Sequence, residues 1–280
     1  MKFKTSFSLI SVITAVLFLS LIAVESDAAI TWDNLTYNAF AEAYVGNSSG
    51  YYDYGTSTKN GPPLRISAYA RATNPENSPY SQMAQGYGVV DESSMFLKSC
   101  VFCKGNLGGD AYGYAYTEVT GTFIADDGFF NFGYDYGYTI AARGIDEAAY
   151  AENKAQAFLQ VYDNTTGSFL FNDYLINNEI TATGNEFNTY TDSGADMLSI
   201  PIASSIGHEI QVLFWADYMG KSQGYACAGN SRCDENASFS INYNMDVAPV
   251  VPEPVSSILF LSGGATLAVR RYLRKRAASK

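Results

Sequence analysis

The sequence predicts an all-β protein. We expect one antiparallel β-sandwich or jelly-roll-like domain, flanked by an N-terminal signal peptide and a C-terminal transmembrane helix. Three observations predict this organisation. The dominant hydrophobic period between residues 30 and 247 is two, Gly, Asn and Asp separate the alternating stretches, and each end of the chain carries an uncharged apolar run. The expected boundaries in this chain of 280 residues are 1–28, 29–250 and 251–280.

The charge is distributed unevenly. The chain has 17 Lys and Arg against 28 Asp and Glu, a formal net charge of −11. Eight of the basic residues lie in the terminal segments, which leaves nine basic against 25 acidic residues between them. A strongly acidic exported domain excludes nucleic acid as an expected partner. The single histidine, His208, also excludes a histidine-rich metal site.

The first element is the predicted signal peptide. Lys2 and Lys4 precede an apolar run over residues 7–24, and small residues follow at Ser26 and Ala28. This order is typical of a segment that signal peptidase removes, and we expect cleavage after Ala28. The mature chain then folds in an oxidising compartment.

The exported domain is predicted to consist of short strands. Its alternating stretches are residues 64–72, 112–119, 130–138, 155–163, 168–176, 197–203, 209–218 and 237–245. Turn residues between two apolar runs predict a hairpin over 158–171. Residues 46–79 are rich in Asn, Ser, Gly and Pro and predict long loops around one strand. Residues 145–156, rich in Ala and Glu, predict the one helix of the domain.

Two series of alternating tyrosines are the most unusual feature of the domain. Their members are Tyr112, Tyr114 and Tyr116 in one strand and Tyr134, Tyr136 and Tyr138 in another. Each series lies on one face of its strand. Exposed rings of this kind stack on sugars, and their phenols hydrogen-bond hydroxyl groups. The alternative is that the rings build the sheet interface, which is the more common use of aromatic residues in strands.

The four cysteines predict disulfides. They lie in two close pairs, Cys100 with Cys103 and Cys227 with Cys233, and both pairs flank loop-like sequence. We expect each local pair to form a bridge, although bridges across the two groups close longer loops and stabilise more in the chain-entropy model. A redox function lacks its βαβ context, and five residues inside the second pair do not fit a zinc knuckle.

Catalytic motifs are weak, and we predict no catalytic residues and no cofactor. Residues 46–50 match G-x-S-x-G, but this motif should lie between a strand and a helix, and residues 51–55 (Tyr-Tyr-Asp-Tyr-Gly) follow it instead. The acid pairs at 91–92, 126–127 and 146–147 are compatible with glycoside hydrolysis, with Ca²⁺ binding or with turns. No D-x-D-x-D-G loop supports Ca²⁺, and 126–128 is predicted to be a turn.

The C-terminal element is a short apolar segment that ends in cations. Residues 255–269 carry no charge, and as a helix they rise about 22 Å, less than a hydrocarbon core of about 30 Å. Snorkelling arginines let such a marginal helix span. The basic cluster that follows is expected to stay cytoplasmic, and its members are Arg270, Arg271, Arg274, Lys275 and Arg276.

The tetrapeptide Val251, Pro252, Glu253 and Pro254 stands directly before this segment. Its two prolines keep the backbone extended beside the membrane. The order Pro-Glu-Pro, apolar helix and arginine cluster resembles the PEP-CTERM sorting signal of Gram-negative bacteria that make exopolysaccharide. That resemblance implies passage through the inner membrane, transient processing by an exosortase and delivery to the cell surface or biofilm matrix.

The sequence therefore favours an exported, non-enzymatic surface or matrix protein that associates with extracellular polysaccharide. A carbohydrate-binding module that uses the tyrosine-rich strands is the first alternative. A polysaccharide-acting hydrolase is the second, and it requires two carboxylates that face each other across a cleft.

Overall fold

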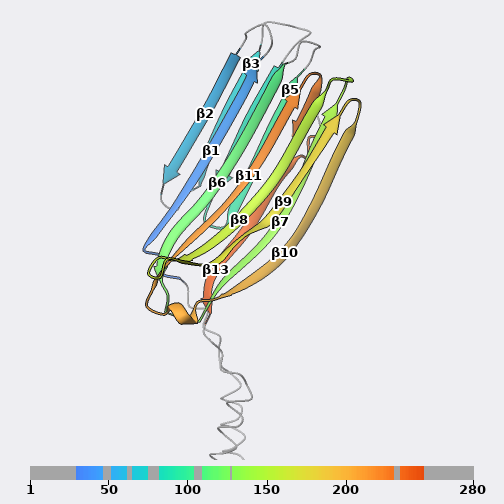
Figure 1. Ribbon diagram of the computed structural model, residues 1–280. Helices are drawn as coiled ribbons and strands as arrows, with labels where there is room; N and C mark the ends of the chain where they lie inside the picture. The colour runs from blue at the N-terminus through green and yellow to red at the C-terminus, as the bar shows by residue number, and fades with distance from the viewer. Residues whose placement is uncertain are drawn as a thin grey trace, which may run out of the picture. The chain divides into compact units, whose positions relative to one another are not determined.

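The computed structural model describes residues 30–46, 52–61, 65–74, 82–103, 109–126, 128–229 and 234–248. They form two antiparallel sheets that pack face to face, so the predicted all-β antiparallel sandwich is confirmed (Figure 1). The only helical element in these ranges is a short 3₁₀ turn, η1 (Ala203–Ser205). The jelly-roll-like connectivity stays a prediction.

No helix within the described ranges has both the length and the apolar character needed to cross a membrane.

One sheet has six strands in the order β2-β1-β6-β11-β8-β9. Their bounds are β1 Asn34–Gly46, β2 Tyr52–Gly61, β6 Asp110–Ile124, β11 Glu209–Gln223, β8 Tyr150–Asp163 and β9 Ser168–Thr183. The order interleaves strands from distant parts of the chain, so residues that are far apart in sequence share one face (Figure 1).

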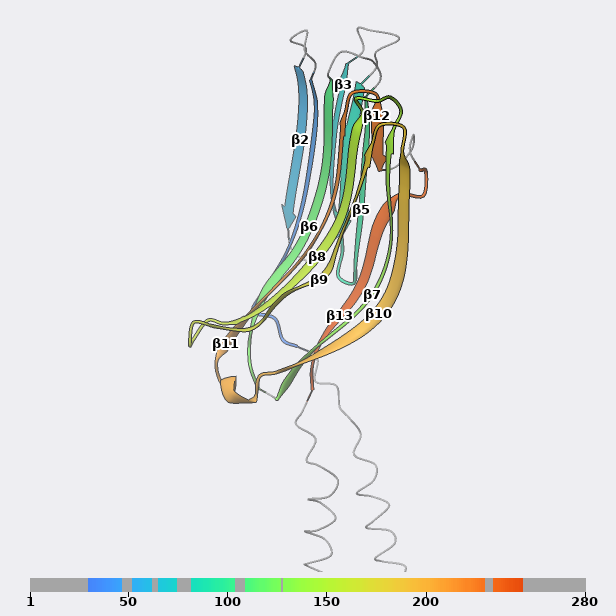
Figure 2. The same ribbon diagram turned by 45° about the vertical axis from the view of Figure 1, so that its right-hand side comes forward.

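The other sheet has seven strands, six of them in the order β10-β7-β12-β5-β4-β3. Their bounds are β10 Phe187–Pro201, β7 Phe129–Gly144, β12 Ala226–Gly229, β5 Ser94–Cys103, β4 Gln82–Val90 and β3 Ile66–Asn74. The seventh, β13 (Ser238–Ala248), pairs with both β5 and β7. Figure 2 shows this sheet, with β5, β7, β10 and β13, to the right of the six-stranded one.

The core between the sheets has two zones. Aromatic and branched side chains fill the zone around β7, β11 and β13, where the rings of Phe132 and Phe214 lie 4.9 Å apart. Between β1 and β6 on one side and β3 and β4 on the other, the buried side chains are mostly alanines. A Cβ added at Gly86 would lie 2.0 Å from the carbonyl oxygen of Tyr114. The two backbones therefore touch there, with no side-chain layer between them.

A buried amide also joins the two sheets. Asn153 on β8 accepts a hydrogen bond from the backbone N–H of Ala141 on β7 at 2.9 Å and donates one to the carbonyl of Met219 at 2.6 Å. The hydroxyl of Tyr218 donates to the carbonyl of Thr139 at 2.7 Å. Such directional bonds fix how the sheets align, because apolar packing alone has little directionality.

The helix predicted over 145–156 is wrong. Residues 145–149 form a turn, closed by a bond from the N–H of Ala149 to the carbonyl of Asp146, and β8 begins at Tyr150. Ala151 and Ala155 are fully buried between the sheets. Tertiary packing of these small side chains overrides the helical propensity of Ala and Glu. The predicted loops over 46–79 also contain β2 as well as the expected strand.

The local bridge between Cys100 and Cys103 is also wrong. Both residues lie on β5 with buried thiols that are not joined to each other. The three residue steps from Cys100 to Cys103 along the strand put their Cα atoms about 10 Å apart and their side chains on opposite faces, beyond the reach of a disulfide. Cys227 on β12 is disulfide-bonded, but its predicted partner Cys233 lies outside the described residues, so that pairing stays a prediction.

Several other predictions fall outside the described residues. They concern the signal peptide at 1–28, the Pro-Glu-Pro tetrapeptide, the C-terminal apolar segment, its basic cluster and the Asn and Ser residues at 47–49.

Candidate functional site

Six aromatic rings form a continuous series across the outer face of the six-stranded sheet. Ring centroids of successive members lie 6.2, 6.5, 6.0, 5.4 and 5.2 Å apart. We call these six residues the aromatic track, and they are Tyr112, Tyr114 and Tyr116 on β6, Trp215 on β11, Phe158 on β8 and Tyr174 on β9. The track crosses four adjacent strands.

Strand register assembles the track. Trp215 on β11 pairs with Phe158 on β8. Tyr116 on β6 also points outward, and it lies diagonally across from Trp215 because it pairs with Asp217, two residues further along β11. A β-bulge after Ala157 shifts β9 so that Tyr174 stands opposite Phe158. Bulges re-aim side chains in this way, and here the bulge extends the track onto the edge strand.

The rings of β6 are half-buried, and Tyr174 at the end of the track is 46% exposed. Buried alanines and Gly113 alternate with the tyrosines and face the other sheet. Gly86 and Gly88 lie against the backbone of β6 directly beneath Tyr114 and Tyr116. The track thus rests on a closely packed base, which favours a rigid surface.

Asp217 is the carboxyl group at the centre of the track. Its Oδ2 accepts one long bond, 3.4 Å, from the hydroxyl of Tyr114. Its Oδ1 is buried and has no hydrogen-bond donor among the described residues. Burial raises the pKa of Asp217 to about 6, against the opposing effects of Lys154 and the Tyr114 hydroxyl. This carboxyl group therefore has unused capacity to accept hydrogen bonds.

Other carboxylates surround the rings. The hydroxyl of Tyr116 donates to Glu118, and that of Tyr150 donates to Glu152 at 2.7 Å. Burial, with the charges of Glu42, Asp217 and Glu152, raises the pKa of Tyr112 to about 12. The phenol of Tyr112 therefore stays protonated at neutral pH.

The second tyrosine series lies elsewhere. Tyr134, Tyr136 and Tyr138 on β7 share the face of Phe132 and point between the sheets, and Tyr138 is only 3% exposed. Tyr136 and Tyr138 donate hydrogen bonds to Oδ2 of Asp192 at 3.2 and 3.4 Å. We therefore leave this series out of the candidate site.

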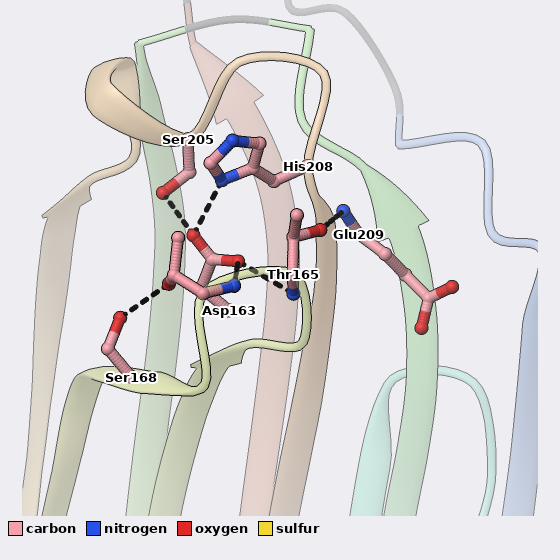
Figure 3. Close-up of polar contacts among 7 residues, drawn as sticks. Asp163, Thr165, Ser168, Ser205, His208 and Glu209 are labelled. Atoms are coloured by element: carbon pink, nitrogen blue, oxygen red, sulfur yellow. Dashed lines mark hydrogen bonds and ion pairs between the residues drawn. The ribbon is translucent and has the colours of Figure 1, made fainter.

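A serine, a histidine and an aspartate meet at the β8–β9 turn (Figure 3). The hydroxyl of Ser205 and Nδ1 of His208 both contact Oδ2 of Asp163 at 2.8 Å. Its Oδ1 accepts the backbone N–H groups of Thr165 and Thr166 at 2.9 and 3.0 Å. The serine hydroxyl thus donates to the carboxylate rather than to the imidazole, which is not the arrangement of an activated nucleophile. The cluster clamps the hairpin turn to the segment that precedes β11.

The hydrogen bonds of this clamp change the ionisation of Asp163. Burial alone disfavours its charge, but the bonds from His208, the Thr166 N–H and Ser205 hold its pKa well below the usual range. The carboxylate is therefore ionised at any physiological pH and serves as a fixed acceptor.

The acid pairs of the sequence lie between strands. Asp91 follows β4, and its carboxylate accepts the N–H of Ser93 at 3.1 Å and the hydroxyl of Ser94 at 2.8 Å. Asp126 and Gly128 lie between β6 and β7, and because Asp127 is outside the described residues, the turn over 126–128 stays a prediction. Within the part of the chain that the structure describes, no group of three or more His, Cys, Asp or Glu side chains could hold a metal ion.

The sequence predicts the three tyrosines of β6 as candidate site residues, but not Trp215, Phe158 and Tyr174, which complete the track. Alternation in the predicted strands 209–218 and 155–163 places Trp215 and Phe158 on the faces opposite the small residues Ala216 and Ala157. The outward direction of Trp215 and Phe158 can therefore be predicted from the sequence. The strand order and the bulge, which bring the three residues to the tyrosines, have no such local signal.

Comparisons with known proteins add no function. No family model and no curated protein matches the chain. Among solved structures, the chain is similar to one from the T13 viral particle of IBDV, with 8% identity over 82% of this chain and 80% of that one. Its TM-score is 0.13, and a likeness at that level carries no argument.

Proposed function

We propose that this chain is an exported, non-catalytic β-sandwich protein that binds extracellular polysaccharide through the aromatic track. The observation that carries the proposal is a series of six contacting rings on one outer face. Aromatic faces bind the apolar faces of sugar rings, and the carboxyl and phenol groups between them can bind sugar hydroxyls. A track across four strands suits a polymer better than a single sugar.

The destination of the protein is part of the same proposal. The terminal segments support export through the inner membrane after cleavage by signal peptidase. The resemblance of residues 251–276 to a PEP-CTERM signal supports processing by an exosortase and retention at the cell surface or in the biofilm matrix. Extracellular polysaccharide, the proposed ligand, is present at that location.

The non-catalytic part of the proposal is supported by the clamp at Asp163. The one serine, histidine and aspartate cluster that resembles hydrolase chemistry is occupied with holding a turn. The carboxylates Glu118 and Glu152 beside the track already accept phenol hydroxyls.

A matched pair of variants tests the proposal. The protein purified from cells that express the full chain is bound to beads of cellulose, chitin, chitosan and alginate. Tyr174→Ala removes the exposed end of the track, and we expect it to weaken retention about 3- to 10-fold, the value of one aromatic contact. The control is Tyr69→Ala, because Tyr69 is equally exposed, at 50%, on β3 of the other sheet. Equal losses in the two variants, or no retention on any bead, would refute the proposed function.

A further inference from the structure

We infer that the aromatic track selects glycans with free amino groups over neutral and uronate glycans. This inference rests on the proposed function and adds the chemical class of the ligand to it.

Carboxylates outnumber lysines on the face that bears the track. Among the described residues of this face, the acidic side chains are Glu42 on β1, Asp110 and Glu118 on β6, Glu209 and Asp217 on β11, Glu152 on β8 and Glu179 on β9, and the lysines are Lys154 and Lys221. Strand register places three of these carboxylates around the tyrosines of β6, because Glu42 pairs with Tyr114, Asp217 pairs with Tyr116, and Glu152 lies two strands from Tyr112 beyond Lys221. The face thus has a negative potential beside its rings, and such a potential attracts cations and repels uronates.

Both lysines of this face already have partners. Nζ of Lys154 lies 4.0 Å from the carboxylate of Glu179. Nζ of Lys221 lies 5.8 Å from the centre of the Tyr150 ring, within cation–π range. Neither ammonium group is therefore well placed to bind the carboxylate of a uronate.

The hydrogen-bonding groups of this face also favour a ligand with amino groups. Asp217 has one buried oxygen with no donor in the described part of the chain, and its other oxygen accepts only the long bond from Tyr114. Oδ2, which accepts only this long bond, therefore has capacity for a donor that a ligand supplies. An ammonium group has three donors and no acceptor, whereas a carboxylate adds only acceptors.

The rings themselves also favour a cation. An ammonium group over the face of Trp, Tyr or Phe is attracted by the negative charge of the π system. Trp215 and the neighbouring tyrosines surround Asp217, so one ammonium group can contact a ring and a carboxylate together. A neutral sugar stacks on the same rings without this additional attraction.

The test compares three soluble oligosaccharides of equal length and β-1,4 linkage. They are oligomers of glucosamine, of N-acetylglucosamine and of mannuronate, titrated calorimetrically against the full-chain protein. The pH is set above about 6, so that Asp217 and the Glu side chains are ionised, and below the pKa of the amines. We expect the glucosamine oligomer to bind about 10-fold or more tighter than the N-acetylated one, and added salt to remove most of this difference.

Charge variants locate the effect. Glu42→Gln combined with Glu152→Gln removes two charges beside the track and should reduce the preference for glucosamine about 3- to 10-fold. The control is Asp135→Asn combined with Asp196→Asn, which removes two charges from exposed positions on β7 and β10 of the other sheet and should leave the preference unchanged.

Each contrary outcome has a separate meaning. Equal binding of the glucosamine and N-acetylglucosamine oligomers, or tighter binding of mannuronate, would overturn the inference and leave the proposed function standing. Equal effects of the two double variants, or a glucosamine affinity that Tyr174→Ala does not lower, would show non-specific attraction and overturn the inference as well. Absence of binding to all three oligomers would count against the proposed function itself.

Discussion

Two aspartates show how hydrogen bonds decide ionisation in this protein. Asp163 and Asp217 are both removed from water, but Asp163 receives bonds from four donors and Asp217 receives one long bond. The pKa of Asp163 falls below its usual range, and that of Asp217 rises to about 6. Asp163 therefore stabilises the fold as an anion, whereas the ionised form of Asp217 opposes it.

Asp217→Asn is expected to stabilise the protein in a pH-dependent way. Because burial raises the folded pKa of Asp217 above the roughly 3.9 of an exposed aspartate, its contribution to stability is full below about pH 4 and is lost as pH rises through 6. Asparagine does not ionise. The variant should match the wild type near pH 4 and exceed it by about 1–2 kcal/mol near pH 8, a value reduced for partial exposure. Urea unfolding at both pH values measures this, and a variant less stable near pH 8 would contradict it.

Removal of the clamp is expected to have the opposite pH dependence. Ser205→Ala deletes a buried donor to Asp163 and should lower the unfolding free energy by about 1–2 kcal/mol at neutral pH. Asp163→Asn should be destabilising above about pH 4 and approach the wild type in acid, since the lowered pKa of Asp163 gives stability that is lost as pH falls.

The control for the clamp is Ser168→Ala, because Ser168 is exposed and contacts only the Thr166 hydroxyl in this cluster. It should change the unfolding free energy by less than about 0.5 kcal/mol. An equal effect of Ser168→Ala and Ser205→Ala would mean that the turn, and not the clamp, sets the stability.

At the scale of elements, close contact between β4 and β6 supports the track. Gly86 and Gly88 let the backbone of β4 approach the carbonyls of Tyr114 and Tyr116. Larger side chains at these inner positions would push β6 away from β4. Gly86 and Gly88 thus set how closely β6, which carries the tyrosine rings, lies to the opposite sheet.

Gly86→Ala is expected to destabilise the protein by about 1–3 kcal/mol, because its Cβ would lie 2.0 Å from a backbone oxygen that cannot move alone. Gly133→Ala on β7 is the control, since the nearest atom to its added Cβ is the flexible Met197 methyl at 3.9 Å. The control should be neutral or up to about 1 kcal/mol stabilising. Thermal unfolding of both variants measures the difference, and equal loss in the two would refute close packing as the cause.

The same elements show what sequence could predict. Alternation in 112–119 and 209–218 predicts strands because one face of β6 and β11 is buried along its whole length. Residues 145–156 mislead, because alanine favours a helix locally and also fits the thin core. The bridge between Cys100 and Cys103 is predicted wrongly because two residues three positions apart in a strand lie about 10 Å from each other. Only the tyrosines of β6 are predicted as part of the candidate site, because the strand order that brings the other three rings beside them is a non-local property.

At the scale of the whole sandwich, the two outer faces differ in chemistry. On the seven-stranded sheet, several outer residues of β7, β10 and β13 are polar and bond to one another, although Phe187 and Met197 on β10 are also exposed. Examples are Thr139 with Thr191 at 3.0 Å and Asn242 with Asp135 at 2.7 Å. The aromatic track lies only on the six-stranded sheet. Aromatic residues also lie on the outer face of the seven-stranded sheet, at Tyr69, Tyr87 and Phe96, so the faces differ in that the series of six contacting rings is on the six-stranded sheet.

The proposed glycan binding requires that the domain reach a polysaccharide, and the ends of the mature chain test that step. Mass spectrometry of the protein from cells with an active processing enzyme should find an N-terminus at Ala29 and loss of the segment after Pro254. Cells without the enzyme should retain Lys280, because only a membrane enzyme that recognises the Pro-Glu-Pro segment is expected to remove the apolar helix. Lys280 intact in both cell types would disprove the sorting proposal, and glycan binding by the track would then need a different route to its ligand.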